Sequence, residues 1–314
     1  MKKSSTKPRR KMLSRRRTKS LTSATIPKKF ETLATAKKRS KKLIKAAYPA
    51  DPAKVHERAR MLLWQFDHPK NGDTRTLPAA QLRCFRIANF FCGLESCPIC
   101  LAKFQPAVVS LIVDHFGDQD FVDWVTAIPP DGRVEVGSLA SCELGPFQEA
   151  LKRKLRKVFG RETLIIGAVD IGYRMHANKD RHWVRHLHFF VHPKVSADQE
   201  QQMKRLFADS SGSVHCPVKV ETVPRSDLER VAAYTYKCFH LRKSSKDIAT
   251  TDGTSKRGPG WPQPSQRPET MERHYAQSKN AVGDLLFLMG AKRKRSSDPF
   301  KIDGVDAPSH NGIV

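Results

Sequence analysis

The chain changes its hydrophobic pattern several times between residues 52 and 240. Apolar residues that recur every three or four positions predict amphipathic helices, whereas short runs of β-branched and aromatic residues predict strands. The predicted helices are Pro52–Phe66, Phe147–Phe159, Ala197–Ala208 and Ser226–His240. The predicted strands are Phe121–Ile128, Thr163–Met175, His182–His192 and Val218–Val223.

From residue 121 the order is strand, helix, strand, strand, helix, strand, helix. This order predicts an α+β fold with a mainly antiparallel central sheet and helices packed on it. We expect four parts: a disordered basic arm at 1–50, a helical and cysteine-rich module at 51–115, the α+β domain at 116–242 and a loop-rich basic extension at 243–314. In the extension, 243–279 lacks a core pattern and predicts a loop or linker, and the apolar turn Leu285–Met289 is expected to dock on the core.

Charge narrows the class of partner. The formal net charge is +26 and the pI is near 10.0, which favours a polyanion, nucleic acid first. Residues 1–50 carry 18 Lys and Arg against the single acid Glu31, and so +17 of that charge, although a presequence or a nuclear-localisation signal has the same composition. The predicted helix Phe147–Phe159 is also basic, and its charged residues could equally be a solvated face. The residues expected to bind DNA phosphates are Arg15, Arg16, Arg17, Lys152, Arg153 and Arg156.

No run approaches the roughly 18 to 20 apolar residues that a membrane span needs. The basic N-terminus is not followed by the apolar core of a signal peptide. We therefore expect an intracellular protein with no membrane partner.

Four of the seven cysteines are crowded together: Cys84, Cys92, Cys97 and Cys100. Such crowding in an intracellular protein favours a metal over disulfides. The Cys97-Pro98-Ile99-Cys100 spacing can place two thiolates on one tetrahedral Zn²⁺, so we expect structural zinc bound by these four cysteines. His68 could replace Cys84, and unligated buried thiols are the alternative to a metal site.

The segment His186-Leu187-His188 lies on a predicted strand, where side chains two apart project from the same face. The two imidazoles therefore form a pair of metal ligands. Asp170, on the preceding predicted strand, could complete a two-His-one-carboxylate site for Mg²⁺ or Mn²⁺. His182 and His192 are alternative ligands, although His192 lies about 13 Å along the strand from His188 at roughly 3.3 Å per residue, too far to share the same ion.

Tyr234 and Lys237 are three residues apart on a predicted helix that opens with the capping-box pattern of Ser226 and Glu229. Residues at this spacing share a helix face, so the hydroxyl and the ammonium could approach one phosphate. Tyr236 would point away from that face and pack instead. The pattern suggests attack of the Tyr234 phenol on a phosphodiester beside a histidine-bound cation.

These residues together resemble the HUH endonucleases, named for His-hydrophobic-His, and specifically the rolling-circle replication initiators of bacterial plasmids. In that family a strand bearing His-hydrophobic-His precedes a helix bearing Tyr-x-x-Lys, as His186 and His188 precede Tyr234 and Lys237 here. The Cys-Pro-Ile-Cys block at 97–100 also resembles the Cys-Pro-x-Cys element of many plasmid initiators. The resemblance covers about residues 84 to 242.

The resemblance implies a ferredoxin-like palm and a nicking enzyme. Tyr234 would attack the scissile phosphate and leave a 5′-phosphotyrosine link and a free 3′-hydroxyl, while the histidines hold the cation and Lys237 orients or neutralises the phosphate. A single nucleophile is implied, because two-tyrosine members carry a second tyrosine where Arg230 stands here. The implied partners are single-stranded or cruciform origin DNA, a host helicase and a host polymerase, and the implied location is the bacterial cytoplasm.

Two positions depart from the family pattern. Arg185 precedes the first histidine where many relatives have proline, and Asp170 stands where the acidic ligand is often glutamate. An HUH transposase of a mobile element would use the same residues, whereas conjugative relaxases usually place the tyrosine before the histidines. A non-catalytic zinc protein that binds DNA or RNA is the alternative from a different class.

Overall fold

The structure is a computed structural model, and its described residues do not include the N-terminal arm with Arg15, Arg16 and Arg17. The described residues are 52–68, 76–87, 89–175, 181–208, 216–237 and 266–293, together with the backbone of the short strands 241–244, 247–249, 255–257, 261–264 and 305–306.

The core is an eight-stranded sheet with the strand order β5-β1-β4-β3-β6-β9, in which β10 also pairs with β3 and β2 also pairs with β4. Every pairing in this sheet is antiparallel except that of β3 with β6. The predicted α+β class with a mainly antiparallel sheet is therefore confirmed. The strands are β1 Phe121–Ala127, β2 Arg133–Glu135, β3 Ile165–Met175, β4 Arg181–Val191, β5 Val218–Pro224, β6 Leu241–Ser244, β9 Trp261–Pro264 and β10 Leu286–Met289.

Two small ladders lie outside the main sheet. They pair β7 Asp247–Ala249 with β8 Ser255–Arg257 and β11 Lys292–Arg293 with β12 Val305–Asp306. The described helices are α2 Pro52–Asp67, α3 Ala79–Arg86, α4 Pro98–Phe116, α5 Leu144–Phe159, α6 Ala197–Leu206, α7 Leu228–Thr235 and α8 Arg267–Gln277.

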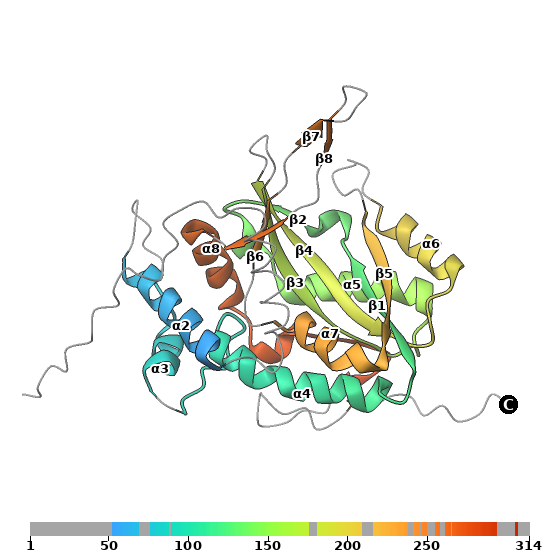
Figure 1. Ribbon diagram of the computed structural model, residues 1–314, viewed down its shortest axis with the longest axis horizontal. Coiled ribbons are helices and arrows are strands. Elements are labelled where there is room, and N and C mark those ends of the chain that lie inside the picture. The colour runs from blue at the N-terminus through green and yellow to red at the C-terminus, as the bar shows by residue number, and fades with distance from the viewer. Residues whose placement is uncertain are drawn as a thin grey trace, which may run out of the picture.

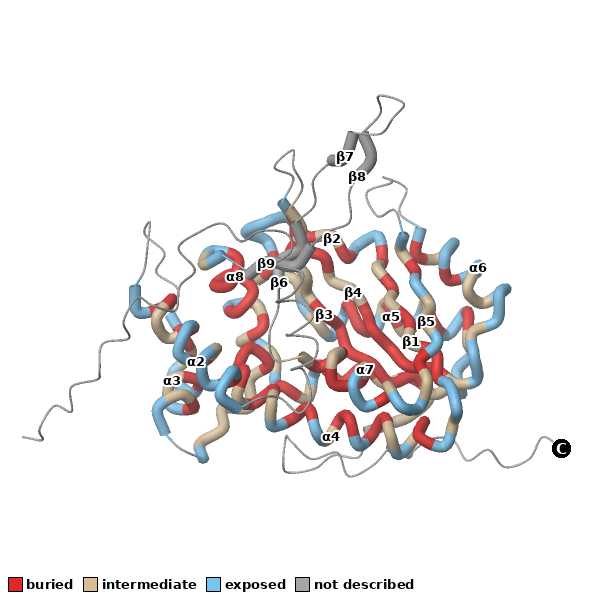
Figure 2. The backbone as a smooth tube through the Cα atoms, viewed as in Figure 1, coloured by how far each residue is buried: buried red, intermediate tan, exposed pale blue. Residues whose placement is uncertain are grey.

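Helices cover both faces of the sheet, as Figure 1 shows. Helices α4 and α7 pack on one face, and α5 and α6 pack on the other. Alternation along β4 explains the division: Phe190 joins the cluster formed with α4 and α7, while Leu187 and Phe189 join the cluster formed with α5 and α6. The central strands are consequently buried, as the red segments in Figure 2 show. His186 and His188 share the parity of Phe190 and so belong to the α4/α7 face.

Helix α7 is shorter than the sequence pattern predicts. It ends at Thr235, not at His240, and Asp227 is its N-cap, with no side-chain hydrogen bond, so the predicted capping box of Ser226 and Glu229 does not form. Tertiary contacts explain the early end. The Gln105 amide of α4 donates to the carbonyl of Ala233 at 2.8 Å and to that of Tyr236 at 3.3 Å, satisfying helix-end carbonyls that another turn would use.

The predicted loop or linker at 243–279 is also wrong in part, because α8 lies within it. Its buried residues are mostly polar, among them Thr270, Glu272 and Gln277, and Met271 is its one buried large apolar residue. A helix without an apolar stripe carries little periodic signal. The expected docking of Leu285–Met289 is confirmed by the pairing of β10 with β3.

Helix α4 overturns the expectation that no segment is long and apolar enough for a membrane span. By length and composition its 19 residues meet that requirement. Half of the apolar window is buried inside the protein, and Phe104, Val108 and Ile112 are fully enclosed in the core. The core helix of a soluble protein passes the same test, so the helix is weak evidence for a membrane.

Candidate active site and cysteine cluster

The pairing of β3 with β4 brings three potential metal ligands together. Asp170 is the direct cross-strand partner of His186, and His188 follows two residues later on the same face. The Asp170 Oδ2 atom lies 3.4 Å from His186 Nε2 and 3.9 Å from His188 Nε2. One ligand atom from each residue lies within 4.8 Å of the others, so this group could hold a metal ion. His182 and His192, the alternative ligands, are not part of it.

Hydrogen bonds orient both imidazoles. His186 Nδ1 lies 3.2 Å from the Val184 carbonyl, which can only accept, so Nδ1 donates to it and Nε2 is the nitrogen that faces Asp170. His188 Nδ1 lies 2.9 Å from Thr126 Oγ1, from the partner position on β1. His186 Nε2 is therefore the atom placed to bind a cation together with the Asp170 oxygen.

Aromatic rings form a wall beside the histidines. Trp124 of β1 stacks on His188 with ring centroids 5.0 Å apart, and its Nε1 donates to Thr235 Oγ1 at 3.2 Å. The Tyr234 ring meets both rings edge-on, at 6.1 Å from Trp124 and 6.3 Å from His188. Tyr234 therefore lies directly beside the three-residue group.

Lys237 reaches the same group by a different path from the one predicted. Helix α7 ends before it, so Lys237 and Tyr234 are not neighbours on a helix face. The chain nevertheless turns so that Lys237 Nζ lies 2.5 Å from Asp170 Oδ2 and 4.7 Å from the centre of the Tyr234 ring. Burial lowers the pKa of Lys237, but the attraction of Asp170 and Tyr234 outweighs it, so the pKa rises above its ordinary value and the ammonium stays charged.

Tyr236 has a structural environment, as the sequence predicts. Its side chain is 1% exposed, packs edge-on against Phe104 and donates from Oη to the Gly167 carbonyl at 2.5 Å. Burial raises its pKa well above the ordinary value. Tyr234, by contrast, is only partly buried, so of these two tyrosines it is the one at the candidate metal group.

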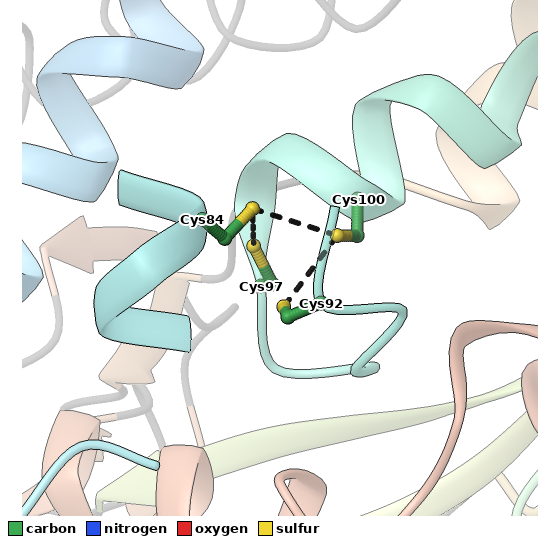
Figure 3. Close-up of side chains that lie close together, drawn as sticks. All are labelled: Cys84, Cys92, Cys97 and Cys100. Carbon is green, nitrogen blue, oxygen red and sulfur yellow. Dashed lines mark hydrogen bonds between the residues drawn. The ribbon is translucent and has the colours of Figure 1, made fainter. Parts of the chain in front are cut away.

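The four clustered cysteines also converge, as Figure 3 shows. Their sulfur atoms are 3.5 Å apart for Cys92 and Cys100, 3.6 Å for Cys84 and Cys97, and 3.8 Å for Cys84 and Cys100. A disulfide would require about 2.05 Å. A tetrahedron with metal–sulfur bonds of about 2.3 Å has edges of about 3.8 Å, so these separations fit one metal held by four thiolates.

Local structure explains the convergence. Cys84 lies on α3, Cys97 is the N-cap of α4, Cys100 is in its first turn, and Cys92 comes from the intervening loop. The Gly93 amide donates to Cys100 Sγ at 3.3 Å, the kind of bond that supports a metal-bound thiolate. The alternative ligand His68 is not part of this group.

The thiols constrain one another's protonation. Hydrogen bonds from the other cysteines lower the pKa of Cys84, and similar bonds raise the pKa of Cys97. Each thiol therefore affects the proton affinity of the others. A bound metal would draw off the remaining protons because it binds the thiolate form.

The basic helix α5 lies on the opposite face of the sheet from Asp170 and the histidines. Arg153 and Arg156 are exposed there, while Lys152 pairs with Glu149 at 2.7 Å. A strand bound at the metal group would have to pass round the sheet to reach them. Their predicted role in DNA binding remains a prediction, as does that of the arm.

Sequence reasoning missed Thr126 and Trp124 as parts of the site. Both lie at alternate positions of one predicted strand and so share a face, which was an available signal. Their apposition to His188 depends on which strand is its neighbour, and the sequence pattern alone did not specify that.

Comparison with known proteins finds no matching family model, no matching curated protein and no matching solved structure.

Proposed function

We propose that this protein is an HUH-type, single-tyrosine DNA endonuclease and strand transferase that initiates rolling-circle replication. The observation that supports this best is the meeting of Asp170, His186 and His188 with Tyr234 and Lys237 at one place on the sheet. Two imidazoles, a carboxylate, a phenol and an ammonium are the groups that a metal-assisted attack on a phosphodiester needs. The palm identity of the sheet is part of the same proposal.

In this proposal the Tyr234 oxygen attacks the scissile phosphorus. A bond from phosphorus to the tyrosine oxygen forms, and the bond from phosphorus to the 3′-oxygen breaks. The phenol proton is lost to solvent, and the leaving 3′-oxygen takes up a proton to become a free hydroxyl. The products are a 5′-phosphotyrosine link and a 3′-end that a polymerase can extend.

The donor set formed by Asp170, His186 and His188 suits Mg²⁺ or Mn²⁺, and the bound ion would polarise the phosphate oxygens. Lys237 would then act on the substrate. Its ammonium is paired with Asp170 Oδ2, the same oxygen atom that lies nearest to Nε2 of both histidines. If Asp170 held a cation, the Lys237 ammonium would be available to pair with the phosphate.

The cysteine cluster is proposed to hold a structural zinc ion. Its four sulfur donors and their spacing favour Zn²⁺ over hard cations such as Mg²⁺. The ion would fix α3 against the start of α4. Because α4 binds the end of α7 through Gln105, the zinc segment would also support the segment that carries Tyr234.

The proposed substrate is single-stranded or cruciform origin DNA, with a host helicase and polymerase acting after the nick. The proposed location is the cytoplasm of a bacterium. An HUH transposase of a mobile element would use the same residues on a different DNA.

The test is an adduct assay that resists SDS, with purified protein, Mn²⁺ and a pool of single-stranded DNA that includes the sequence flanking its own gene. We expect an adduct whose modified peptide contains Tyr234, and its loss in Tyr234→Phe. His186→Ala and His188→Ala should remove metal-dependent cleavage.

Tyr236→Phe is the matched control because it removes the same hydroxyl two residues away. It should keep adduct formation and lose stability, by about 1–3 kcal/mol for a buried carbonyl left unpaired. A Tyr234→Phe protein that nicked at the wild-type rate would show that Tyr234 is not the nucleophile. Salt-sensitive DNA binding without any adduct under varied metals would instead support a zinc-containing binding protein.

A further inference from the structure

A polar pocket lies between α2, α8 and the segment that leads into α4. Its polar lining consists of Arg58, Glu95, Ser96, Arg273, His274 and Gln277. None of these residues belongs to the cysteine cluster or to the three-residue metal group. The proposed nicking chemistry therefore leaves this pocket without an assigned role.

Arg273 is the unusual member of the pocket. It is 5% exposed, and its Nε is buried with no acceptor. Among the residues that the structure describes, no hydrogen bond or ion pair is found for its guanidinium. Burial, together with repulsion from Arg58, lowers its pKa to about 9. A buried guanidinium nitrogen without an acceptor destabilises a fold, so an anion bound in the pocket would stabilise it.

Arg58 supplies a second positive charge to the same pocket, from a different element. It lies on α2, and within the described part of the chain its guanidinium likewise has no ion pair. Burial lowers its pKa to about 10, so it is still charged at neutral pH. Two guanidiniums that repel each other across one pocket would both be stabilised by a single anion between them.

Three carboxylates, those of Asp170, Glu269 and Glu95, raise the pKa of Arg273, but burial and the charge of Arg58 outweigh them. The Glu95 oxygens accept from Gln277 Nε2 at 2.7 Å and from Asn280 Nδ2 at 2.8 Å, and burial raises the Glu95 pKa to about 7. His274 Nε2 donates to Gln81 Oε1 at 2.8 Å, and burial lowers its pKa to about 3, so it stays neutral. The donors left for a ligand are the guanidiniums.

The charges of the pocket and of the candidate active site act on one another: Asp170 raises the pKa of Arg273, and Arg273 opposes the rise in the pKa of Lys237.

We infer that Arg58 and Arg273 form a phosphate-binding pocket between α2 and α8. Planar guanidiniums bind phosphate oxygens in pairs, which suits this ligand class. The phosphate could belong to the DNA strand beside the nick, which rests on the proposed function, or it could be free. The shared chemistry is one phosphate group between two arginines.

The first experiment is calorimetric titration of the full chain with inorganic phosphate. Arg58→Met and Arg273→Met should each weaken phosphate binding by about tenfold or more, because each removes charge-assisted hydrogen bonds. Arg60→Met is the matched control, since Arg60 is an exposed residue of the same helix as Arg58 and does not line the pocket. Equal affinity in all three variants and the wild type would overturn the inference.

Thermal unfolding separates a ligand-binding role from a structural one. If Arg273 serves a ligand, Arg273→Met in phosphate-free buffer should melt at the wild-type temperature or above it, because a buried unpaired charge is removed. If the arginine is a structural contact, the variant should melt lower. That result, together with unchanged phosphate affinity in Arg58→Met, would refute a phosphate pocket.

A second titration identifies the source of the phosphate. An oligonucleotide without terminal phosphates is added to the Tyr234→Phe protein, which cannot form the proposed adduct. Displacement of inorganic phosphate by the oligonucleotide, with weaker oligonucleotide binding in Arg273→Met than in Arg60→Met, would support a strand phosphate. Phosphate binding without displacement would support a free phosphate and refute the strand. Neither result depends on nicking, so failure of the proposed function remains distinguishable.

Discussion

At the residue scale, Glu95 illustrates how burial changes an ordinary carboxyl. It is 3% exposed, and burial raises its pKa from 4.5 to about 7. The folded-state pKa thus lies above the unfolded value. Its contribution to stability is therefore fully present below pH 4.5 and is lost as the pH rises towards 7.

We predict that Glu95→Gln removes this dependence. The variant's free energy of unfolding, relative to the wild type, should rise by about 3 kcal/mol between pH 4.5 and pH 7, because the amide does not titrate. Urea denaturation of both proteins across that range measures the difference. Glu149→Gln is the control: Glu149 is exposed, and its bond to Lys152 lowers its pKa, so the difference should be small and opposite in sign. A constant difference for Glu95→Gln would contradict the prediction.

The wild type alone would hide this effect because His274 opposes it. Burial lowers the pKa of His274 from 6.5 to about 3, so its contribution is present above pH 6.5 and is lost on acidification. Between pH 4.5 and 6.5 the two residues change stability in opposite directions. Only the difference between variant and wild type isolates Glu95.

At the scale of elements, the cysteine cluster joins α3 to the start of α4. We predict that the purified chain contains about one zinc per molecule, that Cys92→Ser lowers this content, and that chelation lowers the melting temperature. Cys142→Ser should change neither, since Cys142 lies outside the cluster. Zinc content by atomic absorption and thermal unfolding with and without chelator are the measurements. Full zinc content in Cys92→Ser would contradict a four-cysteine site.

The sequence predicts some elements well and others poorly, for identifiable reasons. Strands β3 and β4 have long apolar patterns, so both could be predicted, and alternation placed His186 and His188 on one face. The register that pairs Asp170 with His186 does not follow from alternation. The end of α7 could not, because Gln105 lies 128 residues before Ala233, whose carbonyl it binds. Helix α8 is held by polar contacts, such as Glu272 accepting from the Gly137 amide at 2.7 Å, which leave no periodic signal. Arg273 lies on this helix, so the sequence pattern did not indicate the pocket proposed for Arg58 and Arg273.

At the scale of the whole molecule, the basic charge and the candidate active site are unevenly distributed. Residues 1–50 carry +17 of the +26, which leaves +9 for the rest of the chain. Helix α5 adds basic residues on the face opposite Asp170. General attraction to DNA and chemistry at the nick are therefore expected to depend on different parts of the protein.

We predict that deleting residues 1–50 weakens DNA binding without removing adduct formation. The slope of log affinity against log salt should become shallower by about 0.7 for each lost phosphate contact on single strands. Fluorescence anisotropy at several salt concentrations measures the slope, and the adduct assay at low salt is the control. An unchanged slope would show that the arm does not bind DNA.

The contact of Lys237 with Asp170 means that the candidate metal group already contains a positive charge of its own. We therefore expect the sheet to fold around Asp170 without a divalent ion, because the ammonium balances the charge of the carboxylate. The four thiols hydrogen-bond to one another, and Cys100 accepts from the Gly93 amide, which is neutral. We therefore expect zinc to be needed during folding, whereas the catalytic ion could bind afterwards. The folded protein would then stay inactive until that ion and DNA are both present.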